Sequence, residues 1–372
     1  MMNFQPYLAV NLLSIVPGRI GGAEEYAVRT LLAFAEHGPS DIRPTLYTVN
    51  SFEQAHPELV NYFEVVSCPI DGTVRSRRVL AESTWLMNKT KSALAVHHLG
   101  GRLPIRTNKP SCVTIHDLQP LDYPANFSSI KAAYLSWAIP RSIRRADVVV
   151  AVSDHVAERI RTGFPIDPEK VLTVSSGVQE IAKQPAKPNT TPVILYPAAT
   201  YPHKNHLVLI RAFEEIADRH SDVQLILTGV AGRAESEVAR AIEESRHVDR
   251  IERTGRVSSA MMKKIVETAT VLAFPSSYEG FGLPVLEAMA AGVPVVVSSG
   301  TPAAEIINQP NLTVSPEDVQ GWVSALERVI LDEQQRNEAA SHGLIRAEKY
   351  RWENSAEQLE RAWRQLLSRK NK

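Results

Sequence analysis

Two glutamates, Glu279 and Glu287, are separated by seven residues in a stretch whose neighbours could turn them into a binding site. Residues 269–275 form a short apolar run that predicts a buried strand, glycines follow it, and Pro284 suits the first turn of a helix ending near Gly292. A strand, a glycine loop and a helix N-terminus together make a cradle for an anion. Backbone N–H groups and the positive end of the helix dipole face a phosphate there.

The two carboxylates would contact different parts of one ligand. Glu279 lies on the predicted loop beside the phosphate, and Glu287 lies about one turn inside the helix, where it can accept hydrogen bonds from a diol such as a ribose. One segment would thus hold several parts of a nucleotide-sugar. Physical reasoning leaves an alternative open, in which Glu279 ends a strand and Glu287 complements the helix dipole. The backbone groups expected to face the phosphate are those of Gly280, Phe281, Gly282 and Leu283.

Composition indicates a two-domain enzyme without a bias toward nucleic acid. The chain has 372 residues, which exceeds the size at which a single core stops growing, and a formal net charge of zero. No apolar run reaches the roughly 18–20 residues of a membrane span, and residues 1–7 lack the features of a signal peptide, so we expect a cytoplasmic protein. Cys68 and Cys112 fit no zinc or disulfide pattern and are expected to be buried thiols.

Apolar runs alternate with helical patterns in two series, which predicts parallel sheets covered on both faces. Residues 181–192 are rich in proline and polar residues, as expected of a linker between two domains. The predicted strands before this linker are Tyr7–Leu13, Pro44–Val49, Ala93–His97, Cys112–Ile115, Val148–Val152 and Val171–Val174. The predicted strands after it are Val193–Tyr196, Gln224–Thr228, Thr270–Phe274 and Pro294–Val297, with helices such as His203–Arg219 and Val257–Glu267 between them.

The segment 277–292 closely resembles the signature of the retaining glycosyltransferases of family 4. The resemblance implies an α/β protein of the GT-B fold, with two Rossmann-like, doubly wound parallel-sheet domains facing each other across a cleft. It also implies that Glu279 lies beside the donor sugar, that Glu287 binds the ribose, and that the amides of residues 281–283 hold the diphosphate. The domains expected are an acceptor domain (1–180), the linker (181–192), a nucleotide-sugar domain (193–352) and a terminal helix crossing back to the first domain (353–372).

A second glycine turn, Gly18 to Tyr26, joins the first predicted strand to a helix that runs to about His37. Its spacing is not that of a dinucleotide fingerprint, and a plain strand-to-helix turn remains the alternative. The Gly-Gly-Ala-Glu sequence resembles the family's first-domain loop, where the glycines face the donor phosphate and the acceptor. By this resemblance Gly21 and Gly22 are assigned to the donor site.

His116 and Asp117 end a predicted strand, at the edge of the sheet where open α/β domains usually bind ligands. Taken alone, such a histidine is more often structural. The segment that continues from them to Tyr123 resembles a part of the family in which the histidine contacts the transferred sugar. We therefore assign His116 to catalysis and Asp117 and Tyr123 to acceptor orientation. A structural role is expected for His97-His98.

Lys204 follows a predicted strand of the second domain, where its charge is well placed for a diphosphate. The alternative is a solvated lysine in the first turn of a helix, an unfavourable place for a cation. Members of the resembled family carry a lysine here that binds the donor diphosphate. Many also carry an arginine six residues earlier, where this chain has Ala198. Either Lys204 acts with the helix dipole alone or another cation contributes, for which Arg256 is the candidate.

The expected reaction transfers a sugar from a nucleotide-sugar with retention of anomeric configuration. Cations and amides at the phosphates stabilise the charge that develops on the leaving group. Because the chain has no Asp-x-Asp triplet and the resembled family works without metal, we expect no metal and no cofactor. The context of Lys204 resembles a subgroup that adds mannose to bacterial surface glycans, which points to GDP-mannose. A nucleotide-sugar epimerase and a catalytically silent nucleotide- or glycan-binding module are the alternatives.

Residues 72–145 carry twelve Lys and Arg against three Asp and Glu. Trp85, Tyr134 and Trp137 are interspersed among them, a combination that suits the surface of an anionic membrane carrying a lipid-linked glycan acceptor. A solvated, partly phosphate-facing surface is the alternative. The expected location is therefore the cytoplasm, with peripheral contact at the inner face of the membrane as an option, and no nucleic-acid partner is expected.

Overall fold

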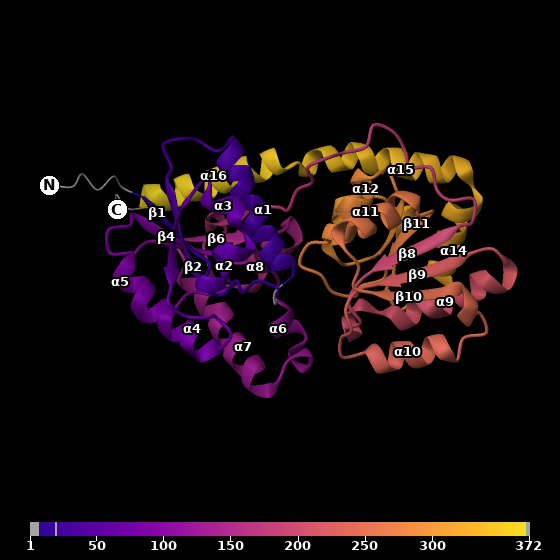
Figure 1. Cartoon of the computed structure of the whole chain (residues 1–372), viewed down its shortest axis with the longest axis horizontal. Coiled ribbons are helices and arrows are strands. Elements are labelled where there is room, and N and C mark those ends of the chain that lie inside the picture. The colour runs from indigo at the N-terminus through magenta and orange to yellow at the C-terminus, as the bar shows by residue number, and fades with distance from the viewer. Residues whose placement is uncertain (1–6, 19–20, 370–372) are drawn as a thin grey trace. The chain divides into compact units, whose positions relative to one another are not determined.

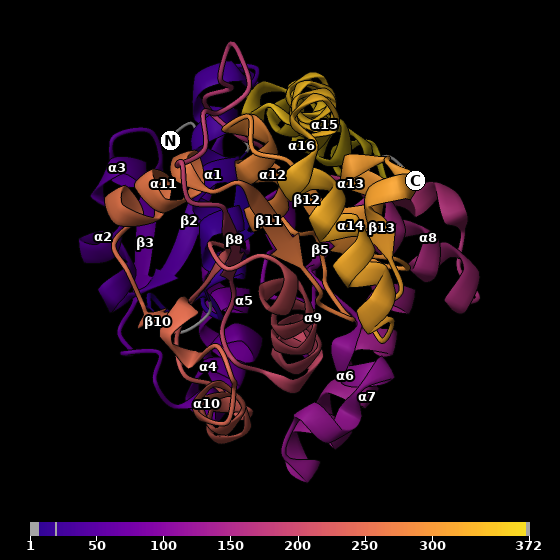
Figure 2. The same cartoon turned by 90° about the vertical axis from the view of Figure 1, so that its right-hand side faces the viewer.

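The computed structural model describes residues 7–18 and 21–369. Contacts divide the chain into two compact units. Unit 1 comprises the described residues of Met1–Gly177 and Trp352–Lys372, and unit 2 comprises Val178–Arg351. Each unit contains one all-parallel sheet flanked by helices, as Figures 1 and 2 show. This confirms the predicted fold class of doubly wound α/β domains.

Unit 1 has a seven-stranded sheet in the order β3-β2-β1-β4-β5-β6-β7. Its strands are β1 (Leu8–Asn11), β2 (Pro44–Val49), β3 (Glu64–Cys68), β4 (Ala95–His98), β5 (Ser111–Ile115), β6 (Val148–Ala151) and β7 (Val171–Thr173). Its helices are α1 (Gly22–His37), α2 (Asn50–Ala55), α3 (Pro57–Val60), α4 (Arg75–Ala81), a π-helical turn (Glu82–Leu86), α5 (Met87–Lys89), α6 (Gln119–Asp122), α7 (Ser129–Arg145), α8 (Asp154–Gly163) and α16 (Trp352–Ser368).

Successive side chains along β5 and β6 point to opposite faces of the sheet, and helices cover each face. Val113 and Val149 pack with α7 and α8 in one buried cluster. Thr114, which points to the opposite face, accepts a hydrogen bond from His97 Nε2 at 2.8 Å. His97 Nδ1 in turn accepts a bond from the indole N–H of Trp363 on α16, at 2.9 Å. The terminal helix is therefore fastened to the centre of the sheet of unit 1, beside α1.

Unit 2 has a six-stranded sheet in the order β10-β9-β8-β11-β12-β13. Its strands are β8 (Val193–Pro197), β9 (Gln224–Thr228), β10 (Ile251–Gly255), β11 (Val271–Phe274), β12 (Val295–Ser298) and β13 (Thr313–Val314). Its helices are α9 (His206–Arg219), α10 (Glu235–Glu243), α11 (Ser259–Thr268), α12 (Leu283–Ala290), α13 (Pro302–Ile307), α14 (Val319–Leu331) and α15 (Glu333–Ala347).

The strand order of unit 2 reverses at one point of the sheet, where open α/β sheets form a crevice. The chain leaves β8 toward β9 on one side and leaves β11 toward β12 on the other, although β8 and β11 are neighbours. In sheets of this kind ligands bind outside the carboxyl ends of the two strands at which the order reverses. The loops after β8 and β11 carry Lys204 and Glu279. The fold thus brings these two residues to the same crevice.

Several local features differ from the sequence expectations. The patterns did not predict β3, β10 and β13. The helix expected over His203–Arg219 is interrupted, because a short 3₁₀ turn (Pro202–Lys204) ends at Asn205, whose φ of 58° is left-handed, and α9 begins only at His206. Lys204 therefore lies before the helix and not in its first turn. Residues 181–192 lie along unit 2, where the backbone N–H of Ala182 donates to Ala290 O at 2.7 Å.

Candidate functional site

The loop after β11 leads directly into α12. Val271–Phe274 is fully buried, and the chain then bends through residues 275–282 to the helix, which begins at Leu283. Gly282 precedes it with φ of 121°, a conformation that L side chains rarely adopt, and a Cβ there would lie 3.4 Å from that of Ala303. The sequence needs a glycine here so that the chain can turn sharply and present the start of α12 at the carboxyl edge of the sheet.

Lys204 and Glu279 form a close ion pair at this edge. Lys204 Nζ lies 2.6 Å from Glu279 Oε1, with side chains that are 18% and 13% exposed. The same ammonium lies 5.6 Å from the ring centroid of Phe274. Sequence reasoning assigned both residues to one site, but it did not predict that each would be the other's partner. The pair leaves a positive and a negative group partly exposed to solvent at the carboxyl edge of the sheet.

Hydrogen bonds hold the two loops together below this ion pair. The buried Tyr196 hydroxyl donates to Lys204 O at 2.6 Å and lies 3.0 Å from Ser276 Oγ. Ser277 N donates to His203 O at 2.8 Å. Asn205 Nδ2 donates to Pro275 O at 3.2 Å, so the residue with the left-handed conformation also links the loops. The position of Lys204 is therefore determined by its backbone neighbours and does not depend on the ion pair alone.

Glu287 and Arg256 are exposed. Glu287 lies one turn inside α12, as predicted from its spacing. Arg256 follows β10, which is separated from β8 by β9, so the sheet places it two strands away from Lys204. Neither hydrogen bonds nor ion pairs connect Arg256 to the other predicted site residues in the described part of the chain.

A different arginine, Arg253, organises this side of the sheet. Its Nη1 donates to Gly229 O at 2.8 Å and its Nη2 donates to Glu235 Oε2 at 3.0 Å. Thr200 Oγ1 donates to the same carboxylate, which helps to hold the pKa of Glu235 below its usual value, and accepts a bond from Gly232 N at 2.7 Å. Sequence reasoning missed this network because nothing in the sequence pairs residues that are far apart along the chain.

In unit 1, the glycine turn before α1 is fixed by a carboxylate. Gly21 precedes the helix with φ of 49°, and Gly22 is its first residue. Glu24 Oε2 accepts a hydrogen bond from Gly18 N at 2.8 Å, and its other oxygen lies 2.9 Å from His56 Nε2. Glu24 was not among the predicted site residues, although it belongs to the Gly-Gly-Ala-Glu sequence that marked the turn. The contacts of Glu24 give the Gly-Gly-Ala-Glu sequence a structural role in the turn.

His116 ends β5 and is held as a neutral side chain. Its Nε2 donates to Leu99 O at 2.7 Å, which leaves Nδ1 as the ring nitrogen with a lone pair. The ring lies 5.4 Å from that of Tyr26, edge to face. Burial lowers the pKa of His116 below its usual value, so the imidazole is uncharged at neutral pH. Asp117 Oδ1 accepts a bond from Gln119 N at 2.9 Å, and Tyr123 is exposed beyond α6.

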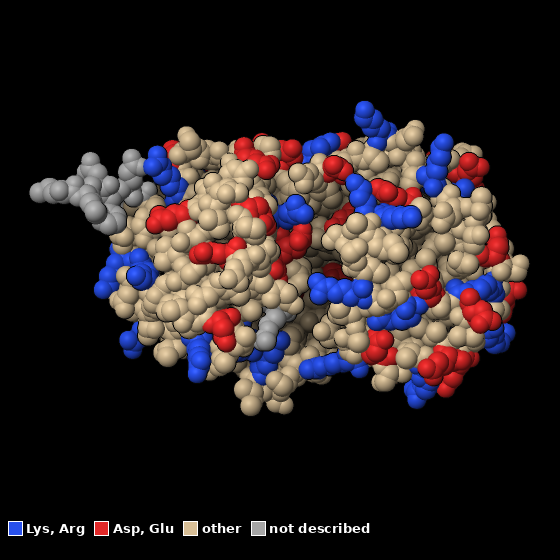
Figure 3. Space-filling model, in the orientation of Figure 1, with Lys and Arg blue, Asp and Glu red and all other residues tan. Residues whose placement is uncertain are grey.

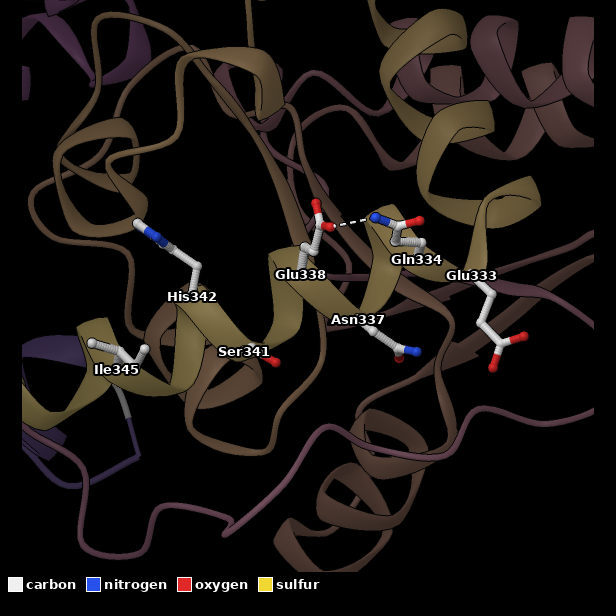
Figure 4. A pocket seen from close by; sticks show the side chains of 7 residues that line it. All are labelled: Glu333, Gln334, Asn337, Glu338, Ser341, His342 and Ile345. Carbon is white, nitrogen blue, oxygen red and sulfur yellow. Dashed lines mark hydrogen bonds between the residues drawn. The ribbon is translucent and has the colours of Figure 1, made fainter.

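The described residues contain no group of side chains that could hold a metal ion, because no three His, Cys, Asp or Glu side chains gather within residues 7–18 and 21–369. Cys68 and Cys112 are buried free thiols. The hollow drawn in Figure 4 is lined by seven residues that all come from one helix, α15, so no polar groups converge on it from other elements. Nor does any described helix combine the length and hydropathy needed to cross a bilayer.

Comparison with known proteins identifies the family. Residues 177–344 match the model of the glycosyl transferases group 1, and residues 20–180 match that of Glycosyltransferase Family 4. The chain belongs to the family 4 glycosyltransferases. The two matches together span both units, so the transferase is related to this family over almost its whole length.

Curated relatives and a solved structure agree with this assignment. An O-antigen chain mannosyltransferase B from Escherichia coli is 26% identical over 79% of this chain and 82% of its own. The O-antigen chain mannosyltransferase RfbU from Salmonella typhimurium is 27% identical over 87% and 90%. A sucrose-phosphate synthase from Thermosynechococcus elongatus aligns over 98% of this chain and all of its own with a TM-score of 0.79, at 20% identity. That likeness establishes the GT-B fold of the transferase.

Proposed function

We propose that this transferase moves mannose from GDP-mannose to a glycan or lipid-linked glycan, during synthesis of a bacterial surface polysaccharide, with retention of anomeric configuration. The observation that carries the proposal is the crevice of unit 2, where Lys204 pairs with Glu279 on the loop that leads into α12, at the reversal of strand order. The choice of mannose is supported by the two O-antigen mannosyltransferase relatives. Without them the crevice would support a nucleotide-sugar donor of unspecified base.

The diphosphate of the donor would lie between Lys204 and the backbone of residues 280–283. When the bond between the sugar and the phosphate breaks, negative charge grows on the phosphate oxygens. An ammonium and a helix N-terminus stabilise that charge more strongly in the transition state than in the bound donor. Lys204 is already oriented by Glu279 at 2.6 Å, so little reorganisation is needed when a phosphate replaces or joins this carboxylate as its partner.

The two glutamates would then have separate roles. Glu279, adjacent to the phosphate-binding ammonium, accepts hydrogen bonds from hydroxyls of the donor sugar. Glu287, exposed one turn into α12, accepts bonds from the ribose diol. We assign Glu279 to sugar binding and not to nucleophilic attack. The leaving phosphate would accept the proton of the attacking hydroxyl on the same face of the sugar, which requires no resident metal.

In unit 1, His116 would contact the transferred sugar through Nδ1. Because Nε2 donates to Leu99 O, Nδ1 can accept a hydrogen bond from a sugar hydroxyl. The neutral ring suits this role, since a charged imidazolium beside an oxocarbenium-like sugar would oppose the reaction. Gly21 and Gly22 would face the donor phosphate, while Asp117 and Tyr123 would orient the acceptor.

Thermal stabilisation by a panel of nucleotides and nucleotide-sugars tests this proposal. We expect GDP-mannose and GDP to raise the melting temperature of unit 2, while UDP-glucose, UDP-N-acetylglucosamine and GDP-fucose raise it less. The shift should shrink in Glu287→Ala and persist in Glu333→Ala, a matched change on the exposed face of α15. Absence of any shift across the panel would refute the donor site.

Product analysis separates transfer from the other activities that this fold could support. The proposal predicts that GDP-mannose is consumed only when a glycan acceptor is present. Conversion of the donor without an acceptor would show an epimerase. If the chain binds GDP-mannose but does not consume it with any surface-polysaccharide acceptor tested, it is a silent binding module.

A further inference from the structure

One stripe of helix α7 is apolar although it faces solvent. Ile130 is 87% exposed and Trp137 is 50% exposed, and seven positions place them on the same face two turns apart. The opposite face of the helix carries Ile139 and Ile143, which are buried in the core of unit 1. Because α7 packs on the core of unit 1 through its inner face, the apolar side chains of the outer face are not needed for core packing. Figure 2 shows α7 at the periphery of this unit, beside α6.

Cations surround the stripe and stack on its aromatic rings. The Arg141 guanidinium lies 5.4 Å from the ring centroid of Trp137, and that of Arg75 on α4 lies 5.7 Å from Tyr134. Lys131 Nζ lies 4.7 Å from the ring of Phe127. These contacts join α4, α7 and the loop before β5 into one surface, since Arg141 also donates to Pro104 O at 3.1 Å.

Two acidic side chains close to this surface are already paired with arginines. Glu82, the acidic side chain nearest in sequence to α4, is 2% exposed and pairs with the buried Arg102 at 2.6 Å. Asp122 is bound by both terminal nitrogens of Arg159. In Figure 3, Lys and Arg side chains lie around the area over α4 and α7, with acidic ones among them. The side chains that define this surface are therefore hydrophobic, aromatic and positively charged.

We propose that α4 and α7 of unit 1 form a docking surface for an anionic phospholipid membrane. Ile130 and Trp137 would enter the interface between headgroups and acyl chains, while Arg75, Lys131 and Arg141 contact lipid phosphates. Charge complementarity favours lipid over a protein partner, because the aliphatic stems of Arg and Lys cover the apolar stripe while their heads reach an anionic surface. The proposal rests on this surface and does not depend on the donor assigned above.

Vesicle co-sedimentation of the full chain tests the proposal. We expect binding to vesicles of phosphatidylcholine mixed with phosphatidylglycerol, little binding to phosphatidylcholine alone, and release as the ionic strength rises. An Ile130→Ser/Trp137→Ser double variant should bind the mixed vesicles about tenfold or more weakly, because two large apolar side chains no longer enter the interface. It should unfold at the same temperature as the unmodified chain, which shows that it is folded and keeps this test independent of nucleotide binding.

A matched control changes apolar residues elsewhere. Leu331 and Ile345 are 59% and 70% exposed in unit 2, and a Leu331→Ser/Ile345→Ser variant should bind vesicles as the unmodified chain does. Brominated lipid should quench the fluorescence of the unmodified chain more than that of Trp137→Phe. The proposal would be overturned by equal quenching in the two proteins, or by vesicle binding that survives the double substitution. It would also be overturned by a dimer in solution that Ile130→Ser/Trp137→Ser dissociates, because that result would assign the stripe to a second copy of the chain.

Discussion

Mild acid should destabilise unit 1 through two buried histidines on β4. His97 and His98 are 0% and 2% exposed, and burial lowers the pKa of each to about 3. Neighbouring basic groups act in the same direction, because a proton on His97 would be repelled by one on His116, and a proton on His98 would be repelled by Arg102 and by one on His97. Both rings are therefore neutral in the folded protein, whereas in the unfolded chain they would titrate near the usual value of about 6.5.

The sign and size of the effect follow from proton binding. As the pH falls below about 6.5, the unfolded chain takes up protons that the folded chain does not, so stability falls with falling pH. Between pH 7.5 and 5.5 each of these two histidines should remove about 1.4 kcal/mol, and the two together about 2.7 kcal/mol. Burial also lowers the pKa of His116 and of His155 in the same unit, and these two rings add to the loss in the same direction. For a unit of this size, a loss of about 2.7 kcal/mol corresponds to a melting temperature lower by roughly 5–11 °C. Carboxylates remain ionised at pH 5.5 and contribute little in this window.

Hydrogen exchange of peptides from β4 to β6 measures this loss in unit 1 without interference from unit 2. The opening free energy should fall by at least about 2.7 kcal/mol between pH 7.5 and 5.5, and the fall should be smaller by about 1.4 kcal/mol in a His98→Gln variant. The exposed His37, replaced by Gln, serves as the control and should leave the full pH dependence intact. A fall of less than about 0.5 kcal/mol, or an unchanged dependence in His98→Gln, would show that the buried rings are not held neutral.

Three substitutions test other parts of the account. Arg102→Met leaves the Glu82 carboxylate buried and unpaired, so the free energy of unfolding in urea should fall by about 3–5 kcal/mol. Adding Glu82→Gln should recover most of this loss. Equal losses in the single and the double variant would refute the pairing argument. Trp363→Phe removes one hydrogen bond and leaves His97 Nδ1 without a donor. The opening free energy of α16, measured by hydrogen exchange, should therefore fall by about 1–3 kcal/mol. An unchanged value would contradict the role of this hydrogen bond in holding α16 on the sheet. Gly282→Ala forces a side chain into φ of 121° and should cost about 1–3 kcal/mol by urea unfolding of unit 2; a neutral effect would show that the turn tolerates a Cβ.

The central strands could be predicted from the sequence because they are continuous apolar runs. Val148–Ala151 is buried at every position, as a strand covered on both faces must be. Three of the four edge strands, β3, β10 and β13, escaped prediction for the opposite reason, whereas the edge strand β7 was predicted. Glu64–Cys68 and Ile251–Gly255 carry polar or half-buried residues, since their outer sides face solvent, and Thr313–Val314 has only two residues. The inner strands could be predicted because their burial on both faces requires apolar residues at every position, and not because of intrinsic strand propensity.

At the candidate site, the sequence predicted residue types and local elements but not partners. The strand, glycine loop and helix around Glu279 could be predicted because each leaves a local signal. The ion pair with Lys204 could not, because it joins loops 75 residues apart that meet only through the strand order. Arg253, whose bonds to Gly229 and Glu235 fix the neighbouring loops, gave no signal in sequence, since a single arginine on a strand is not a motif.

Calorimetric titration of GDP and UDP into the unmodified chain and into Lys204→Ala tests the central claim most directly. A charge-assisted hydrogen bond to phosphate is worth about 1.5–3 kcal/mol, so Lys204→Ala should bind GDP roughly 10–150-fold more weakly. Lys263→Ala, which removes an exposed lysine of the same unit, should bind as the unmodified chain does. GDP affinity that is unchanged in Lys204→Ala, or equally reduced in Lys263→Ala, would contradict the assignment of the diphosphate to this crevice.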